Sequence, residues 1–400
     1  MSKMTVRDVN PSGQRALVRV DFNVPLDDQQ RITDDNRIRA SLPTVQSLLE
    51  RGAAVILMSH LGRPKGKRVP EMSLQPVASR LGELLGRPVA LAPDCIGPEV
   101  TALAGRLRPG QVLLLENLRF YKEEEANGPD FARQLAALGS LYVNDAFGTA
   151  HRAHASTEGV THHVAPSVAG LLMEKEITYL TEALDHPQRP FLAILGGAKV
   201  SGKLEVIQNL LDKVDALAIG GGMAYTFLKA QGLEVGRSLL EAELQDTARQ
   251  TIEQARDRGV DLLLPVDTVV ADRFAADART QVVDCTQIPR EWEGMDIGPR
   301  TRALFAERTR QARTVVWNGP LGVFEMEAFA AGTKAVAQAL AEATQGGTVS
   351  IIGGGDTAAA VAQAGVAEQM THISTGGGAS LEAMSGLVLP GVAALTDREG

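Results

Sequence analysis

One stretch near the carboxyl end constrains the fold of this chain more than any other. Residues 348–364 run from an apolar segment through three glycines and Asp356 into an alanine-rich segment. This order predicts a strand, a glycine turn and a helix. Such a turn presents backbone N–H groups at a helix N-terminus, where an anion is stabilised. Asp356 would repel a bound phosphate unless Mg²⁺ lay between them. Alternatively, Asp356 is only an N-cap, and the stretch alone leaves both interpretations open.

Length and composition narrow the class of protein. A chain of 400 residues exceeds what one hydrophobic core usually holds, so we expect two domains. The formal charge of -8 argues against nucleic-acid binding. Residues 1–10 are polar, and no apolar run approaches the roughly 18 residues that cross a bilayer. Cys95 and Cys285 lie far apart, which suits a reducing compartment. We therefore expect a cytoplasmic protein with neither a signal peptide nor a membrane partner.

Short apolar, often β-branched runs alternate with helical segments and end in polar or glycine-rich clusters. This alternation predicts the α/β class, with two doubly wound parallel-sheet (Rossmann-like) domains. The ligands of such sheets bind at the carboxyl ends of the strands. The predicted strands are Arg15–Val20, Ala53–Met58, Pro88–Leu91, Val112–Leu115, Ser140–Val143, Pro190–Leu195, Ala216–Ile219, Leu262–Val266, Thr314–Trp317, Thr348–Ile352 and His372–Ser374.

The strand ends of the first half carry many basic side chains. In a parallel sheet these ends share one edge, so the basic residues could converge in a pocket for a small, multiply anionic ligand. Two histidines three residues apart, His151 and His154, are a conceivable zinc pair, but no nearby Cys, Asp or Glu completes a ligand set. The converging residues would be Arg37, His60, Arg63, Arg119, His151 and Arg152.

Residues Pro166–Leu184 form a long amphipathic run between the two halves. Prolines at positions 187 and 190 follow it, so we expect a helix that connects two domains. Glycine recurs at nearly every strand end of the second half, which favours a nucleotide site. Residues Gly294–Pro299 read as a loop with a turn proline.

The segment Gly197–Lys203 matches the first part of a P-loop but fails at the next position. Leu204 stands where a P-loop needs Ser or Thr to hold magnesium. What remains is a glycine turn followed by Lys199 and Lys203, which could neutralise charge on a transferring phosphoryl group. We find no dedicated general base, and an already ionised carboxylate acceptor needs none. The sequence therefore predicts phosphoryl transfer between a small anion and a nucleotide.

Seven strings occur in the order found in phosphoglycerate kinases and cover nearly the whole chain, so the sequence resembles that family. The resemblance implies reversible transfer from the acyl phosphate of 1,3-bisphosphoglycerate to MgADP, giving 3-phosphoglycerate and MgATP in glycolysis. It also implies a monomer whose two domains close to bring the substrates together. The strings are Arg19–Pro25, Ser59–Pro64, Glu116–Phe120, Gly148–His154, Gly196–Val200, Trp317–Pro320 and Gly353–Thr357.

The resemblance also implies domain limits and residue roles. Residues 1–170 would bind phosphoglycerate, with the tail 387–400 packed on them, 171–186 would form the connecting helix, and 187–386 would bind the nucleotide. The phosphoglycerate ligands would be Asp21, Phe22, Asn23, Arg37, His60, Leu61, Gly62, Arg63, Arg119 and Arg152. The transferring group would be stabilised by Arg37, Lys199, Lys203, Gly376 and Gly377. The nucleotide ligands would be Gly197, Ala198, Lys203, Gly221, Gly294, Asn318, Pro320, Glu325, Gly353, Gly354, Gly355, Asp356 and Thr357, and Asp356 would hold Mg²⁺.

Two other functions remain open at this point. A dinucleotide-dependent dehydrogenase would explain the glycine pattern that starts at Gly353, but no acidic residue is clearly placed about 20 positions further on. A non-catalytic anion-binding protein would leave Lys199, Lys203 and Asp356 without a role. Titrating NADH against MgADP separates the first alternative from a kinase, and turnover separates the second.

Overall fold

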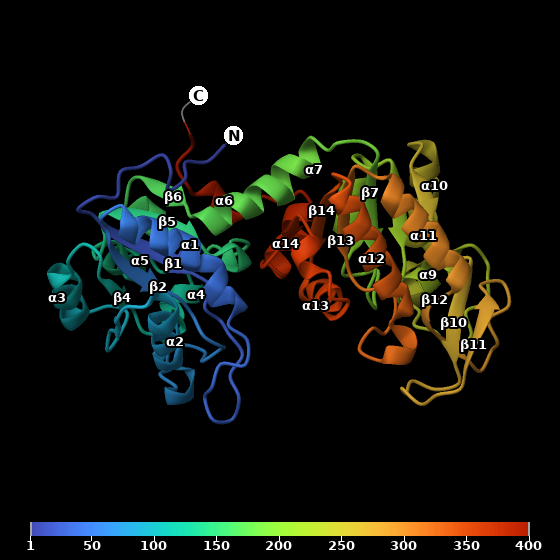
Figure 1. The fold of residues 1–400 in the computed structure, drawn as a ribbon, viewed down its shortest axis with the longest axis horizontal. Helices are drawn as coiled ribbons and strands as arrows, with labels where there is room; N and C mark the ends of the chain where they lie inside the picture. The colour runs from blue at the N-terminus through green and yellow to red at the C-terminus, as the bar shows by residue number, and fades with distance from the viewer. Residues whose placement is uncertain (1, 399–400) are drawn as a thin grey trace. The chain divides into compact units, whose positions relative to one another are not determined.

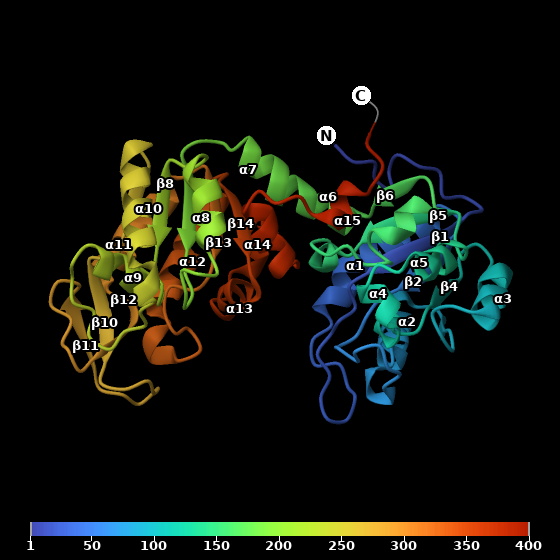
Figure 2. The same cartoon turned by 180° about the vertical axis from the view of Figure 1, so that it is seen from behind.

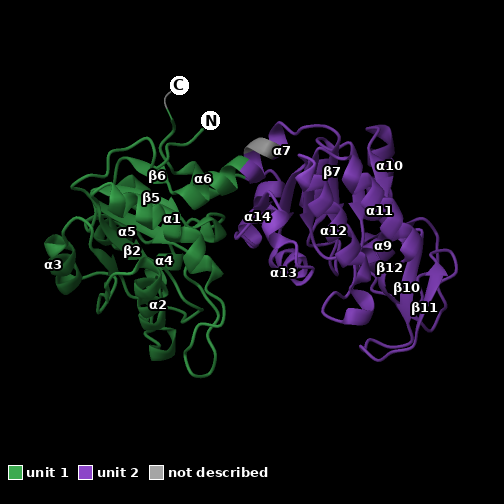
Figure 3. Cartoon of the chain, viewed as in Figure 1, with its two compact units in different colours: residues 1–178, 388–400 green, residues 179–387 purple. Residues whose placement is uncertain are grey.

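The computed structural model describes residues 2–398, and the chain divides into two compact units (Figure 3). Unit 1 comprises residues 1–178 and 388–400, and unit 2 comprises residues 179–387. Each unit contains a parallel sheet with helices packed on it. The predicted class, α/β with two doubly wound parallel sheets, is therefore confirmed.

The sheet of unit 1 has the order β3-β4-β2-β1-β5-β6 within residues 2–178 (Figure 1). Neighbouring strands all pair in parallel. The apolar runs in the sequence form strands that are buried on both faces, except β3, which is partly exposed at the edge of the sheet. The strands are β1 (Arg15–Val20), β2 (Ala54–Met58), β3 (Val89–Leu91), β4 (Val112–Leu114), β5 (Leu141–Asp145) and β6 (Ser167–Ala169).

The core of unit 1 forms where helices α1 and α2 pack on alternate residues of the strands. Ile38 and Leu48 of α1 and Leu81 of α2 are fully buried against Val18 and Val55. This is the pattern expected of an amphipathic helix covering a sheet face. The helices of unit 1 are α1 (Asn36–Glu50), α2 (Gln75–Leu85), α3 (Pro98–Arg106), α4 (Lys122–Glu125), α5 (Pro129–Ala136), α6 (Leu171–Ile177) and α15 (Pro390–Ala393).

The C-terminal segment 388–398 packs on the rest of unit 1. The Gly391 N–H donates to Ala150 O at 2.8 Å, and the Thr396 N–H donates to Ser167 O at 2.9 Å. An ion pair of 2.8 Å joins Lys3 to Asp397. Both ends of the described chain are therefore held by the same unit.

Unit 2 contains a parallel sheet in the order β15-β14-β13-β7-β8-β9 and, among its described residues, an antiparallel sheet β11-β10-β12. Helix α12 lies in front of the parallel sheet in Figure 1 and α8 lies in front of it in Figure 2, so helices cover both faces. The strands are β7 (Phe191–Leu195), β8 (Ala216–Ile219), β9 (Asp261–Leu263), β10 (Asp267–Ala271), β11 (Thr280–Asp284), β12 (Glu293–Ile297), β13 (Thr314–Asn318), β14 (Val349–Gly353) and β15 (His372–Ile373).

Helices α11 and α12 of unit 2 bury apolar residues against the parallel sheet. Phe305 of α11 and Leu340 of α12 pack with Ile194, Val315 and Ile352 of the parallel sheet. The helices are α7 (Ala183–Asp185), α8 (Leu204–Leu211), α9 (Ala224–Ala230), α10 (Gln245–Asp257), α11 (Pro299–Gln311), α12 (Ala331–Gln345), α13 (Gly355–Gln363) and α14 (Gly378–Met384).

Three local predictions were wrong. The predicted loop 294–299 is mostly strand β12, since residues 293–297 pair with β10. The predicted strand 262–266 ends at Leu263, and β10 begins only at Asp267. The predicted helix 166–184 begins at Leu171, because residues 167–169 pair with β5 as strand β6. After Ile177 this helical run continues as a π-helical turn over 178–182 and then as α7.

Candidate active site

The predicted anion-binding residues of unit 1 follow the carboxyl ends of the central strands. In the parallel register Arg19 of β1 lies opposite Met58 of β2, and Val20 lies opposite Asp145 of β5. The segments after these strands therefore leave the sheet at one edge, where α/β proteins bind their ligands.

Asp21 and Arg37 form an ion pair at this edge. The Nη1–H of Arg37, on the first turn of α1, donates to Asp21 Oδ2 at 2.6 Å. Asp21 is only 9% exposed, whereas the Arg37 side chain is 38% exposed. A guanidinium carries five N–H donors in a planar fork. This ion pair therefore orients Arg37 while leaving it able to bind an anion.

The turn after β2 is held by side chains from two other segments. Asn23 Oδ1 accepts the Gly62 N–H at 2.8 Å, and Arg119 Nη1–H donates to Gly62 O at 3.0 Å. Asn117 binds both backbone groups of Leu61, its Nδ2–H donating at 2.7 Å and its Oδ1 accepting at 3.2 Å. Asn23, Leu61, Gly62 and Arg119 are thus brought together by direct hydrogen bonds around one turn.

Positive charge is concentrated around two buried histidines. Burial, followed by the guanidiniums of Arg19, Arg119 and Arg37, holds the pKa of His60 well below its usual value. Burial and neighbouring guanidiniums lower the pKa of His154 to about 3. Both imidazoles are therefore neutral near pH 7, and the guanidiniums make this edge electropositive in a chain of net charge -8.

The remaining predicted residues of unit 1 occupy different environments. Phe22 is fully buried, and its backbone N–H donates to Ser59 Oγ at 2.9 Å. Arg63 and Arg152 are exposed, and Arg152 Nε–H donates to His151 Nε2 at 3.1 Å. Phe22 therefore belongs to the core of unit 1, whereas the two arginines are exposed to solvent.

In unit 2 the register of β13 brings three glycine-rich segments together. Asn318, the last residue of β13, lies opposite Leu195 of β7 and Gly353 of β14. The segments that follow these strands therefore begin side by side. A Cβ at Gly319, where φ is +100°, would lie 2.2 Å from Gly196 O, so only glycine permits this approach.

Two adjoining cavities open among these segments. We call the first, of 320 Å³, the lysine cavity, because Lys199 and Lys203 line it. The second, of 330 Å³, is the tyrosine cavity, because Tyr225 lines it. Predicted residues lining the lysine cavity are Gly197, Ala198, Lys199, Lys203, Asn318, Pro320, Gly354, Gly355, Asp356, Thr357 and Gly377. Those lining the tyrosine cavity are Gly197, Ala198, Gly221, Gly294, Pro320, Glu325 and Asp356.

Gly353 and Gly376 are absent from both linings within the described chain. Gly353 ends β14, and the Gly376 N–H donates to Ser374 Oγ at 3.1 Å. The backbone of the neighbouring Gly377 and Gly378 lines the lysine cavity instead. The run Gly376–Gly378 therefore lines the lysine cavity through its last two residues.

Lys203 is the partly buried cation of the lysine cavity. Its ammonium donates to Asn318 Oδ1, and burial lowers its pKa to about 8 even though the Asp356 carboxylate raises it. Lys199, in contrast, is exposed. The two lysines therefore differ in the strength with which they would act on a bound phosphate, because charges interact more strongly where water is excluded.

The N-terminus of α13 faces the same cavity. Gly354 precedes the helix and Asp356 stands in its first turn, exposed, where its carboxylate lines both cavities. Thr357 is buried, and its Oγ1 accepts the Gly319 N–H at 2.7 Å. A helix N-terminus favours an anion, and a single carboxylate beside it suits Mg²⁺ shared with phosphates.

The tyrosine cavity depends on a glycine at position 294. A Cβ there would lie 1.8 Å from Tyr225 Oη, which hydrogen-bonds Thr268 Oγ1 at 2.7 Å. We expect Gly294→Ala to displace Tyr225 and weaken MgADP binding by at least about tenfold, equivalent to ~1.4 kcal/mol. Isothermal titration with MgADP measures this. Gly202→Ala is the matched control, because a Cβ there meets no heavy atom within 4 Å. Equal affinities for the two variants would refute the prediction.

Sequence reasoning missed several residues around these cavities. The Glu241 carboxylate accepts the N–H groups of Val200 at 2.5 Å and Ser201 at 3.1 Å, and so anchors the loop that carries both lysines. Leu239 and Phe274 add apolar walls to the tyrosine cavity. No local pattern pointed to them, because each acts on a segment remote in sequence.

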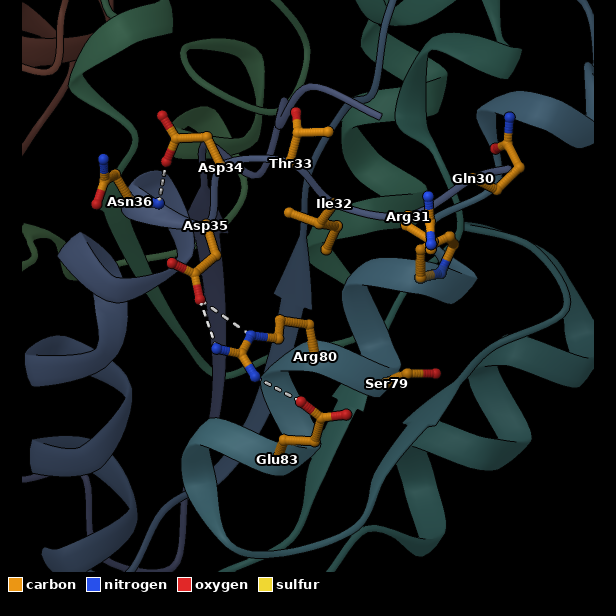
Figure 4. A pocket seen from close by; sticks show the side chains of 11 residues that line it. Gln30, Arg31, Ile32, Thr33, Asp34, Asp35, Asn36, Ser79, Arg80 and Glu83 are labelled. Carbon is orange, nitrogen blue, oxygen red and sulfur yellow. Dashed lines mark hydrogen bonds and ion pairs between the residues drawn. The ribbon is translucent and has the colours of Figure 1, made fainter. Parts of the chain in front are cut away.

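A separate hollow of 740 Å³ lies on unit 1 (Figure 4). Asp35 Oδ2 accepts N–H groups of Arg80 at 2.8 and 2.9 Å, and Arg80 Nη1–H donates to Glu83 at 2.5 Å. Among the described residues, none of those predicted to bind substrate lines it. The lining carries three carboxylates, of Asp34, Asp35 and Glu83, against the two guanidiniums of Arg31 and Arg80, so the hollow does not extend the electropositive edge.

Among the side chains that the structure describes within residues 2–398, no group of three or more His, Cys, Asp or Glu could hold a metal ion. Within the same residues, no helix has the length and apolarity that a membrane span requires.

Proteins similar to this chain share one family description. The profile described as phosphoglycerate kinase matches residues 6–387. The chain is 60% identical over 397 residues to phosphoglycerate kinase of Chloroherpeton thalassium, covering 99% of this chain and 100% of that protein. It is 60% identical over 393 residues to cytosolic phosphoglycerate kinase of Triticum aestivum, covering 98% of each. The structure of phosphoglycerate kinase from Coxiella burnetii is similar, with a TM-score of 0.90, 43% identity and 98% coverage of both chains.

The similarity extends over both units and so includes the segments that form the electropositive edge and both cavities. The resemblance seen in the sequence is confirmed, and the dehydrogenase alternative is not supported. The chain belongs to the phosphoglycerate kinase family.

Proposed function

We propose that unit 1 binds phosphoglycerate, that unit 2 binds the nucleotide, and that residues 171–186 connect the two. The activity is reversible transfer of the acyl phosphate of 1,3-bisphosphoglycerate to ADP, giving 3-phosphoglycerate and ATP, as in the family. The observation that carries the proposal is the contrast between an electropositive edge in unit 1 and a glycine-lined cavity with a partly buried lysine in unit 2. Transfer then requires the two domains to close and bring the substrates together.

On unit 1 the substrate presents a phosphate at one end and a carboxyl group or acyl phosphate at the other. Guanidiniums bind both kinds of group with paired N–H donors. Arg37 would reach the group being transferred, whereas His60 and the turn held by Asn23 would fix the rest of the molecule. The complete proposed set is Asp21, Phe22, Asn23, Arg37, His60, Leu61, Gly62, Arg63, Arg119 and Arg152.

On unit 2 we propose that the base and ribose occupy the tyrosine cavity and the phosphates the lysine cavity. Glu325, at the rim of the tyrosine cavity, would accept hydrogen bonds from the ribose hydroxyls. The N–H groups at the start of α13 would bind the phosphate chain, and Asp356 would hold Mg²⁺. When bound, Mg²⁺ supplies charge neutralisation on the nucleotide phosphates.

The acceptor for ATP is a carboxylate, which is already ionised near neutral pH. The protein therefore needs to position the two reactants and neutralise the charge on the transferring phosphoryl oxygens. We assign that neutralisation to Arg37 and Lys203, with help from Lys199 and the backbone N–H groups of Gly377 and Gly378. Gly376 belongs to the same run and would contribute if its N–H left Ser374.

The experiment that tests this function measures ADP release from MgATP with and without 3-phosphoglycerate. We expect release only when both are present. Release without 3-phosphoglycerate would indicate another acceptor or a plain ATPase. Folded protein that releases no ADP under either condition would refute the activity.

Asp356→Asn tests the metal assignment. The change removes the charge but keeps the size, so we expect the Mg²⁺ concentration for half-maximal activity to rise at least about tenfold, or ~1.4 kcal/mol. Mg²⁺ is titrated at constant nucleotide. Glu325→Gln is the control, because it alters a carboxylate of the tyrosine cavity alone and should raise the KM for nucleotide without moving the Mg²⁺ midpoint. An unchanged midpoint in Asp356→Asn would remove this residue from the metal site.

We also propose that the protein works as a cytoplasmic monomer. The plant relative named cytosolic supports the location. Light scattering on the purified chain would give the mass of one copy, 42.5 kDa, if the monomer is correct.

A further inference from the structure

A fully buried arginine lies directly behind the electropositive edge of unit 1. Arg19, in the central strand β1, is 0% exposed and cannot itself reach a ligand in solution. Its Nε–H donates to Ser156 Oγ at 2.8 Å, and Nη1–H donates to Val20 O. Its Nη2 lies 3.2 Å from His60 Nδ1. A guanidinium has only donors, so Nδ1 must be the acceptor in this contact and cannot carry a proton.

We propose that Arg19 is a positioning residue that fixes His60 as the Nε2–H tautomer, so that His60 offers one directed N–H donor to the anionic substrate. This rests on the proposed function, in which His60 binds phosphoglycerate. A neutral imidazole carries a single proton, and when Nδ1 accepts a hydrogen bond that proton resides on Nε2. His60 then recognises the substrate by a hydrogen bond of set direction and not by charge.

The charges that face His60 support this arrangement. Burial disfavours a cationic ring most, and the guanidiniums of Arg19, Arg119 and Arg37 disfavour it further. A proton on Nδ1 would also point at the Arg19 guanidinium and abolish their hydrogen bond. The surrounding residues therefore act against both alternatives, the imidazolium and the Nδ1–H tautomer.

Arg19 is in turn held by a chain of hydrogen bonds of defined direction. Ser156 Oγ accepts from Arg19 and donates to Glu124 Oε1 at 2.5 Å, and the Ser156 N–H donates to Glu124 Oε2 at 3.0 Å. Glu124 is fully buried, and its carboxylate accepts both bonds. The orientation of Arg19, and through it the tautomer of His60, is thus set by groups that never touch the substrate.

The test is long-range ¹H–¹⁵N NMR of the full chain labelled with ¹⁵N-histidine, with the His60 signals assigned by His60→Gln. In the free wild-type protein we expect Nδ1 to show the shift of an unprotonated nitrogen and Nε2 that of a protonated one. Both shifts should stay constant between about pH 5 and 8, the range in which an unperturbed histidine titrates. A protonated Nδ1, or a titration near the ordinary pKa, would overturn the proposal without any variant.

Arg19→Met removes the donor. The two ¹⁵N shifts of His60 should then move toward each other as both tautomers are sampled. Arg15→Met is the matched control in the same strand, because Arg15 Nε–H donates to Leu138 O at 3.0 Å, and it should leave both shifts unchanged. If Arg19→Met fails to fold, Ser156→Ala loosens Arg19 and should move the shifts the same way. Shifts that stay at their wild-type values in a folded variant would overturn the positioning role.

Adding 3-phosphoglycerate to the wild-type protein separates this inference from the function on which it rests. We expect the Nε2 proton of His60 to shift on binding. A saturating addition that leaves this proton unmoved would overturn the donor role and the proposed binding role of His60. The tautomer itself is decided beforehand, on the free protein.

Discussion

Replacing Lys203 by methionine is expected to lower kcat by about a hundredfold to a thousandfold, the cost of losing one group that stabilises transition-state charge in a closed site. Methionine preserves much of the apolar stem and removes the ammonium. The wild-type ammonium is partly buried beside Asn318 and lines the lysine cavity with Asp356. Steady-state kinetics with MgATP and 3-phosphoglycerate measures the effect, which should fall on kcat more than on KM.

The pH profile gives the same prediction an independent readout. Because burial lowers the pKa of Lys203 to about 8, the free protein loses this positive charge as pH rises through that value. The kcat/KM for nucleotide should therefore be level below about pH 8 and fall above it, and Lys203→Met should lack this falling limb. Lys199→Met is the matched control, since Lys199 is exposed on the same loop and should cost far less. Equal losses in the two variants would contradict the special role of Lys203.

Arg37→Ala is expected to lower kcat by a factor on the order of a hundred to a thousand, because Arg37 would neutralise the transferring group from the phosphoglycerate side. The variant also leaves the Asp21 carboxylate, only 9% exposed, without its partner at 2.6 Å. That carboxylate would then repel the anionic substrate, so the KM for 3-phosphoglycerate should rise as well. Arg37→Lys should recover only part of the loss, since lysine lacks the planar fork.

Arg39→Ala is the control for this prediction. Arg39 lies on the same helix α1, is exposed, and forms an ion pair with Asp35 at 2.8 Å. Its removal should leave kcat and both KM values close to wild type, because an exposed ion pair contributes little. Arg37→Ala with near-normal turnover would exclude the proposed charge neutralisation.

The sequence predicted the two parallel sheets well and the small antiparallel sheet poorly, for physical reasons. Strands such as β1 and β7 are buried continuously, so burial selects the apolar runs that a reader recognises. Strand β11 is largely exposed and reads as polar, and β12 contains Gly294, which usually weakens a strand. In this protein a side chain at position 294 would clash with Tyr225, whose ring and hydroxyl occupy that space.

Some residues of the candidate site could likewise be predicted from the sequence, and others could not. Loops that follow strands were recognisable, because parallel register alone brings Asn318 beside Gly353 and the segment after Leu195. Residues that become partners across a long sequence separation were not recognisable from the sequence. Arg19 meets Ser156, and Glu241 meets Val200, only after the chain has folded. The sequence did give one indication for Arg19, because a charged side chain inside a central strand must have a buried partner.

The return of residues 388–398 to unit 1 has a consequence for biosynthesis. A ribosome makes the chain from its amino end, so every residue of unit 2 is synthesised before the bridge between Asp397 and Lys3 can form. Unit 2 is continuous in sequence, so its fold needs no segment beyond residue 387. Unit 1 obtains helix α15 only after all of unit 2 has been synthesised, so the usual rule that the N-terminal domain folds first does not hold for this helix. The first domain to be translated is thus the last to be finished.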